Sequence, residues 1–168
     1  PADAEFKYRD NLINAYDNSI RYTDDFLSRL IGLLQRQDAG SAMLYTSDHG
    51  EDIFDDHRHL FLHASPVPSY YQLHVPFIVW TSDTYREKYP EHMDALQKNR
   101  HKSVASNRVV FHSVLDLAGV TTTYVNDSLS VASPSYTEFP RFYLNDHNEP
   151  RSYDDIGLRK EDFEMFGK

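Results

Sequence analysis

The sequence MLYTSDHGE at residues 43–51 places an acid and an imidazole side by side, directly after a short apolar run. Ligands of open α/β sheets collect where strands end, and there Asp48 and His49 can turn toward one point. Gly50 can adopt backbone angles closed to other residues, which would let the chain leave sharply. The pair offers two ligands of a divalent metal site, although by itself it also fits an acid that caps a turn beside a packed histidine.

A second group of such residues, DDHRHLFLH, follows at residues 55–63. His63 follows an apolar triplet and precedes Ala-Ser-Pro, so we expect burial on one side and a turn on the other to hold its ring. The other two histidines and the two acids of this stretch have charged neighbours, and we expect them to face solvent. His63 is therefore the residue that we expect to converge with Asp48 and His49.

The composition restricts the ions and partners that such a site could take. The 168 residues include no cysteine, so metal ligands must be His, Asp or Glu. That favours zinc with nitrogen and oxygen ligands, or a harder ion such as Mn²⁺ or Ca²⁺. The net charge of −9 and the lack of a basic stripe argue against a nucleic-acid partner.

The elements that would position these residues follow an α/β rhythm. Apolar residues recur at steps of three and four over residues 12–34, which predicts an amphipathic helix. Residues 42–46 are apolar on both faces, as is typical of a strand buried in a parallel sheet. A second strand is expected at residues 75–80, with Pro76 at its first position because proline has no N–H to donate.

The remaining sequence adds helices and a long C-terminal stretch. We expect a short helix at residues 83–88, a polar connection at residues 90–101, and a helix from Ser106, its N-cap, to Gly119, its C-cap. Residues 121–168 read as an extended strap with one possible helix near residues 160–166. The fold class is α/β, a mainly parallel sheet sandwiched by helices, in which the two strands are expected to be parallel neighbours or near neighbours.

Three motifs carry a resemblance to a known family: YTSDHGE at residues 45–51, LFLH at residues 60–63 and HVPFIVW at residues 74–80. In order and spacing they resemble the sulfatase-like branch of the alkaline phosphatase superfamily, and within it the phosphoethanolamine transferases. The likeness covers residues 12–120. It implies that residues 1–120 are the C-terminal part of a sulfatase-like catalytic domain, and that residues 121–168 are a C-terminal extension packing on the same domain.

The resemblance also implies roles for individual residues. Asp48 and His49 match the pair that ligates the catalytic zinc. His63 matches the histidine that faces the transferred phosphoryl group or a second metal. Glu51 follows the motif, and the resemblance gives it no firm role.

The reaction implied is a two-step displacement through a phospho-enzyme, with a phospholipid donor and lipid A or a related surface glycan as acceptor. The family's nucleophile, a further acidic ligand and another histidine are expected in a missing N-terminal part of the same chain. We therefore expect this chain to be a C-terminal fragment that is inactive alone. The parent enzyme would work at the periplasmic face, anchored by a membrane domain absent from this chain. The family's cysteines are missing, which is a departure from its disulfide-bearing members.

Other functions share this fold and stay open on the sequence. A sulfatase would favour calcium and a formylglycine nucleophile, and a glycerol-phosphate transferase would favour manganese. Another phosphodiester hydrolase, or a binding domain that keeps the fold without chemistry, would also fit. The nucleophile upstream would separate these alternatives, since Thr favours transfer and a modified Cys favours sulfate hydrolysis.

Overall fold

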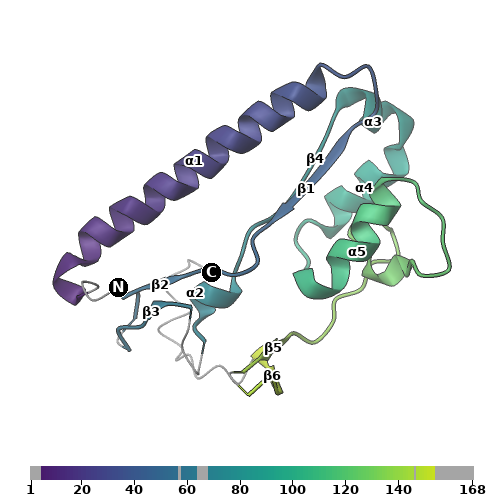
Figure 1. The fold of residues 1–168 in the computed structure, drawn as a ribbon. Helices are drawn as coiled ribbons and strands as arrows, with labels where there is room; N and C mark the ends of the chain where they lie inside the picture. Colours follow the sequence, from purple (N-terminus) through teal and green to yellow (C-terminus); the bar gives the residue numbers. More distant parts are fainter. Residues whose placement is uncertain (1–4, 57, 64–67, 146, 154–168) are drawn as a thin grey trace. The chain divides into compact units, whose positions relative to one another are not determined.

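The computed structural model describes residues 5–56, 58–63, 68–145 and 147–153 (Figure 1). They fall into two compact units. Unit 1 consists of the described residues of Pro1–Ser28, Ser47–Val75 and Pro140–Lys168, and unit 2 of Arg29–Thr46 and Pro76–Phe139. The helix expected near residues 160–166 lies outside the described residues.

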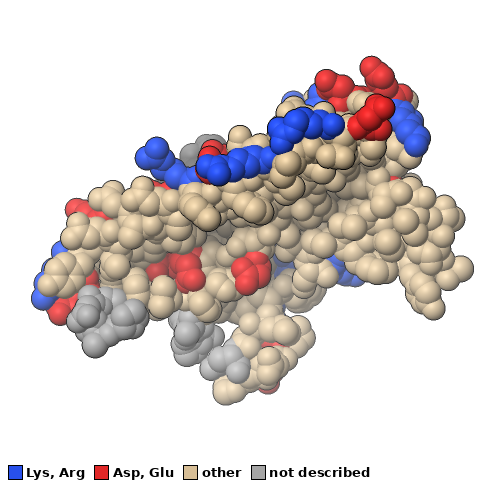
Figure 2. Space-filling model, turned by 45° about the horizontal axis from the view of Figure 1, so that its top comes forward, with Lys and Arg blue, Asp and Glu red and all other residues tan. Residues whose placement is uncertain are grey.

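The predicted N-terminal helix is confirmed as α1, Arg9–Gln35, which follows a short 3₁₀ turn, η1, at Phe6–Tyr8. No residue of α1 is buried against the other described residues. Its exposed apolar side chains are Ile20, Tyr22, Phe26 and Leu33. Much of the surface in Figure 2 is uncharged, with acidic and basic side chains scattered over it. Most of the apolar stripe that predicts the helix is half-buried, and of these four exposed side chains only Ile20 belongs to it.

The two predicted strands are confirmed as β1, Ala42–Thr46, and β4, Phe77–Thr81, and they are neighbours in one sheet of unit 2. The prediction that the two strands are parallel was wrong. The strands are antiparallel, with Leu44 opposite Val79, and both other strand pairs in the described residues are antiparallel as well. An apolar run indicates that both faces of a strand are covered. It does not indicate whether the neighbouring strand is parallel or antiparallel. Pro76 precedes β4 and is not its first residue.

Three helices follow β4 in unit 2: α3, Asp83–Lys88, α4, Pro90–Asn99, and α5, Ser106–Leu117. The first and third were predicted, although the N-cap of α5 is Ala105 and its C-cap is Ala118. Gly119 follows that cap at φ +66°, a left-handed angle that glycine adopts without strain.

The polar connection expected at residues 90–101 was wrong, because α4 occupies most of it. Pro90 is the first residue of α4, where its missing N–H is not needed. The helix buries only Ala95 and Asn99, so it has little apolar signal. The Asn99 amide instead donates to the Val131 and Ser133 carbonyls at 3.0 and 2.9 Å.

The core of unit 2 consists of two apolar clusters. One contains Tyr85, Leu117 and Ala132, and the other Val109, Val131 and Tyr136. Residues after 120 therefore supply part of the core. They also form a short 3₁₀ turn, η2, at Asp127–Leu129.

Unit 1 is built from short elements. A hairpin pairs β2, Asp52–Ile53, with β3, Phe61–Leu62, and a single helical turn, α2, follows at Tyr70–Leu73. A second hairpin pairs β5, Phe142–Leu144, with β6, Pro150–Ser152. The first hairpin and α2 surround the residues that the sequence singled out.

Candidate metal centre

The chain leaves β1 through a tight turn that aims Asp48 and His49. The Ser47 hydroxyl donates to the His49 carbonyl at 2.7 Å, and the His49 N–H donates to Asp48 Oδ1 at 3.0 Å. That backbone N–H is the main cause that holds the pKa of Asp48 below its ordinary value. The Asp48 side chain is 85% exposed, so it keeps its charge at the surface.

Gly50 anchors this turn to α2. Its N–H donates to the Gln72 carbonyl at 2.8 Å, and a Cβ at this position would lie 2.0 Å from the Tyr71 carbonyl oxygen. The expectation of special backbone angles was wrong, because Gly119 is the glycine with positive φ in the described part of the chain. Gly50 is required because two backbone segments approach too closely for a side chain.

His49, Glu51 and His63 come together in unit 1. The His63 Nδ1 lies 2.8 and 3.0 Å from the two Glu51 carboxylate oxygens. The His49 and His63 ring centroids are 4.0 Å apart, and the His49 Nδ1 lies 3.9 Å from Glu51 Oε1. One ligand atom from each of the three residues lies within 4.8 Å of the other two.

Asp48 lies at the other edge of the His49 ring. Its Oδ2 is 3.7 Å from His49 Nε2, whereas Glu51 faces Nδ1. The structure therefore brings His63 to His49 on one side and keeps Asp48 on the opposite side of the ring. His49 stands between two carboxylates, one exposed and one partly buried.

Glu51 is the residue that the sequence interpretation missed. The register of the β2–β3 hairpin explains its position. Asp52 pairs with Leu62, so the residues one step beyond that pair, Glu51 and His63, lie opposite each other. The burial expected at His63 was wrong, since half of its side chain is exposed. Glu51 and the His49 ring hold it, and the turn expected after it lies outside the described residues.

The histidines and acids of residues 55–59, which we expected to face solvent, differ in their surroundings. His57 lies outside the described residues, and His59 stacks on Phe6 with ring centroids 4.4 Å apart. Asp55 Oδ2 accepts a hydrogen bond from the Ile53 N–H at 2.6 Å. Asp56 was placed wrongly, because its side chain is 2% exposed and its carboxylate accepts from Arg58 Nε at 2.9 Å.

A buried polar network fixes the strand next to Glu51. Asp52 is 1% exposed, and its carboxylate accepts hydrogen bonds from the Ser69 hydroxyl and the Gln72 side-chain amide. Burial raises the pKa of Asp52, and the two hydrogen bonds oppose that rise. Because Ser69 is also the N-cap of α2, the network ties the hairpin to the same helix that anchors Gly50.

The donor set fits zinc. Two imidazoles and a carboxylate offer the nitrogen and oxygen ligands that zinc takes in sites without cysteine, and Asp48 adds a further carboxylate beside His49.

The sequence model of the Sulfatase family matches residues 1–120. The chain belongs to the Sulfatase family. Among its relatives, phosphoethanolamine transferase EptA of Salmonella typhimurium is 33% identical over 130 residues, which are 75% of this chain and 23% of that protein. Kdo(2)-lipid A phosphoethanolamine 7''-transferase of Escherichia coli K12 is 41% identical over 78 residues, 45% of this chain and 13% of that protein.

The fold agrees with that of solved members. The C-terminal periplasmic domain of EcEptC from Escherichia coli matches with a TM-score of 0.75 and 25% identity, covering 87% of this chain and 41% of that one, and it has also been solved as a complex with Zn. These likenesses confirm the predicted resemblance to phosphoethanolamine transferases and the sulfatase-like α/β fold. The chain spans about a quarter of the length of the curated relatives, 23% of EptA. None of its described helices is long and apolar enough to cross a membrane.

Proposed function

We propose that this chain is the C-terminal part of the catalytic domain of a zinc-dependent phosphoethanolamine transferase that acts on lipid A or a related surface glycan. The observation that carries the proposal is the placement of His49 between Asp48 on one edge of its ring and the Glu51–His63 pair on the other, in a chain whose relatives are named as such transferases. Residues 1–120 would belong to that domain and residues 121–168 would pack on it. The parent would act in the periplasm from a membrane anchor outside this chain, in line with the periplasmic domains that it resembles.

Each residue of the centre has a distinct task in this proposal. Asp48 and His49 would hold the zinc, and their Oδ2 and Nε2 atoms lie 3.7 Å apart. Glu51 hydrogen-bonds His63 Nδ1 and so orients the ring, leaving Nε2 to face a phosphoryl oxygen or a second ion. A bound zinc supplies a Lewis acid that lowers the nucleophile's pKa and neutralises charge on the phosphoryl oxygens.

The proposed reaction divides between this chain and the rest of the parent. A hydroxyl outside this chain attacks the phosphodiester of a phospholipid, the diacylglycerol oxygen leaves, and the phosphoethanolamine stays on the hydroxyl oxygen. The acceptor's phosphate or hydroxyl oxygen then attacks the same phosphorus and releases the enzyme hydroxyl. His63 would donate a hydrogen bond or a proton to the reacting oxygens. Without the nucleophile, the 168-residue chain would be inactive.

The test uses the parent enzyme, phosphatidylethanolamine and lipid A, with modified lipid A measured by mass spectrometry. We expect His49→Ala and His63→Ala each to lower the transfer rate at least about 100-fold, as losses of charge-stabilising groups do. Asp48→Asn should lower the bound zinc as well. His101→Asn, an exposed histidine of unit 2, is the matched control and should match wild type.

Three results would overturn the proposal. They are full transfer by His49→Ala, hydrolysis of a sulfate ester in place of lipid transfer, and turnover of a nitrophenyl phosphodiester by the 168-residue chain above its His49→Ala variant. The second result would favour a sulfatase, and the third would place the nucleophile within this chain.

A further inference from the structure

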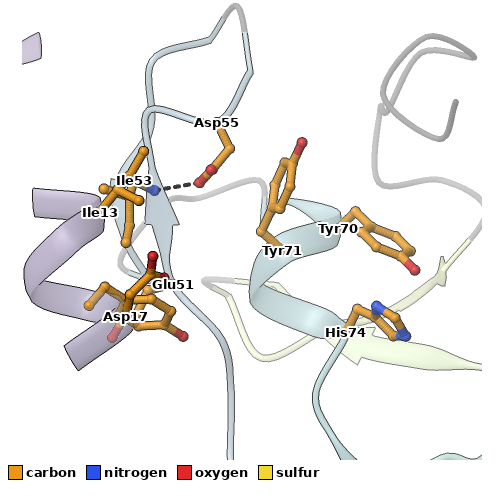
Figure 3. A pocket seen from close by; sticks show the side chains of 9 residues that line it. Ile13, Asp17, Glu51, Ile53, Asp55, Tyr70, Tyr71 and His74 are labelled. Carbon is orange, nitrogen blue, oxygen red and sulfur yellow. Dashed lines mark hydrogen bonds between the residues drawn. The ribbon is translucent and has the colours of Figure 1, made fainter. Parts of the chain in front are cut away.

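Each of the two units contains a cavity. The cavity in unit 1 shares Glu51 with the candidate metal centre and belongs to that site (Figure 3). The cavity in unit 2 has a volume of about 430 Å³ and lies where α1 ends and α3 begins. Gln35 and Gln37 line it together with most of residues 80–86. Its size is within the range of about 300–1,000 Å³ that is usual for small-molecule sites.

The unit 2 cavity is separate from the metal centre. Thr81, the last residue of β4, lines the cavity and pairs with Ala42, the first residue of β1. The chain passes from unit 2 into unit 1 at the other end of β1, after Thr46. Strand residues advance about 3.3 Å each, so the two ends of β1 are roughly 13 Å apart. The cavity and the centre share no residue.

Hydrogen bonds between two backbone segments fix the walls of this cavity. The Ser41 N–H donates to the Ser82 hydroxyl at 2.9 Å, and the Ser82 N–H donates to the Ser41 carbonyl at 2.9 Å. Next to them, Gly40 lies close to α3, because a Cβ at this position would be 3.4 Å from the Tyr85 Cα. Walls that are already ordered lower the entropy cost of binding a ligand.

Trp80 supplies an aromatic surface to the cavity. Phe77 and Val79 pack on the core of unit 2, so Trp80 lies on the other face of β4, where its partner across the strand pair is Met43. Its side chain is half-buried. Among the described residues, no other ring stacks on Trp80 and no group accepts its indole N–H. The indole therefore offers a ligand one flat apolar face and one donor.

The rest of the lining is polar and has no excess charge. The Arg86 Nε donates to the Thr81 hydroxyl at 3.2 Å, and its Nη1 lies 3.6 Å from Asp83 Oδ1. One carboxylate beside one guanidinium attracts neither a phosphate nor a metal ion strongly. Trp80 is the one apolar residue of the lining, so an apolar ligand would leave polar groups without partners.

We propose that this cavity binds a neutral hexopyranose unit, with one C–H face of the sugar against Trp80. The C–H hydrogens carry small positive charges, which the negative π-face of the indole attracts. The amides of Gln35 and Gln37, with Asp83 and Arg86, each present paired donors or acceptors that suit neighbouring ring hydroxyls. The site is not part of the transfer reaction. Only its natural source, the sugar part of a surface glycan, rests on the proposed function.

The experiment measures sugar binding by the 168-residue chain at physiological salt. Methyl α-D-glucopyranoside and methyl β-D-galactopyranoside are the probes. Trp80 is the only tryptophan of the chain, so its fluorescence reports on the cavity directly. We expect at least one glycoside to shift this emission with a Kd of about 1–10 mM. Glycerol, which has neighbouring hydroxyls and no ring, is the matched ligand and should bind at least about tenfold more weakly.

A pair of glutamine variants separates the cavity from the general surface. Gln35→Leu should weaken glycoside binding about fivefold, which corresponds to a loss of about 1 kcal/mol. Gln97→Leu changes an exposed glutamine of α4 outside the cavity and should bind like wild type. Trp80→Leu, followed by the NMR signals of the Gln35 side-chain amide, should weaken binding at least about tenfold.

Several results would overturn the inference. They are the absence of any shift with either glycoside up to about 100 mM, equal binding of glycosides and glycerol, and equal affinities in the Gln35→Leu and Gln97→Leu variants. Tighter binding of glucose 6-phosphate than of both glycosides would assign the cavity to anions and would also overturn it.

The inference and the proposed function fail separately. A parent enzyme that transfers phosphoethanolamine, in a protein whose Trp80 does not respond to glycosides, removes the cavity assignment alone. Glycoside binding that depends on Gln35, in a parent that transfers nothing, removes the proposed function alone.

Discussion

Unit 2 and unit 1 are stabilised by different kinds of contact. Both apolar clusters lie in unit 2, where Val109 and Ala132 are fully buried. In unit 1 the two most buried side chains of the described residues are polar, Ser69 and Asp52 at 0% and 1% exposure. Unit 1 also buries Ile53 and Phe54, and unit 2 also buries serines such as Ser113 and Ser130. The difference lies at the candidate centre, whose neighbouring strand is fixed by the Asp52 carboxylate and its directional hydrogen bonds, which fail sharply when one partner is lost.

The largest expected effect is at the backbone contact of unit 1. Gly50→Ala would place a methyl group 2.0 Å from the Tyr71 carbonyl oxygen and break the hydrogen bond to Gln72. We expect the free energy of unfolding of unit 1 to fall by roughly 4 kcal/mol, from overpacking and one lost hydrogen bond. NMR signals of the His49 and His63 rings measure unit 1, and the fluorescence of Trp80 in β4 measures unit 2.

Gly32→Ala is the matched control for that substitution. Gly32 lies within α1, and the nearest atom to an added Cβ is the Arg36 guanidinium at 3.7 Å. Alanine favours the helix over glycine, so stability should rise by up to about 1 kcal/mol. Equal stabilities of the two variants would show that α2 can move away at Tyr71. The close contact would then not be what fixes the turn at residues 47–50.

The regular elements could be predicted from the sequence, whereas the role of Gly50 could not. Helix α1 and strands β1 and β4 followed from periodicity, because apolar spacing reflects burial directly. The role of Gly50 could not be predicted, since its close approach to α2 involves Tyr71, a distant residue that no local pattern indicates.

The candidate centre was predicted in part for the same reason. His49 was singled out because it follows an acid where a strand ends, and His63 because it closes an apolar triplet. Glu51 was given no role because its contact with His63 depends on the β2–β3 register. Helix α4 was missed because it buries a polar residue, Asn99, in place of an apolar stripe. Strand direction could not be read at all, since covered strands of either direction have similar composition.

The second largest effect should follow loss of the Asp52 carboxylate. Asp52→Ala leaves the Ser69 hydroxyl and the Gln72 amide buried without their acceptor, at about 1–3 kcal/mol for each donor. We expect unit 1 to lose roughly 3 kcal/mol by urea denaturation followed at the His63 ring signals. Asp52→Asn keeps one acceptor oxygen and removes the charge whose burial raises the pKa, so its loss should be smaller. A loss for Asn as large as that for Ala would assign the effect to the charge and not to the acceptors.

Unit 2 should respond less to a single truncation of its core. Val109→Ala removes part of a fully buried side chain from the cluster with Val131 and Tyr136, which should cost about 2 kcal/mol in transfer and cavity terms. The Trp80 fluorescence transition should shift while the His49–His63 ring signals keep their wild-type stability. A Val109→Ala loss larger than that of Asp52→Ala would reverse the comparison between the two units.

The smallest effect concerns the β5–β6 hairpin, whose charges lie at the surface. Glu149 accepts from the Asn145 amide at 3.1 Å and from Arg151 at 2.6 Å, and these contacts, the Asn145 hydrogen bond first, lower the pKa of Glu149 below its ordinary value of 4.5. A carboxyl whose folded pKa is lowered stabilises the folded form above its unfolded pKa, and this contribution is lost as pH falls through the folded pKa. The order of the hairpin should therefore be constant near neutral pH and fall below about pH 4.5. Amide exchange at Tyr143 measured across that range tests this, with Glu149→Gln as the variant that should lose the dependence. A Glu149→Gln profile identical to wild type would assign the acid transition to other carboxylates of unit 1, and the hairpin would then owe its stability to backbone pairing alone.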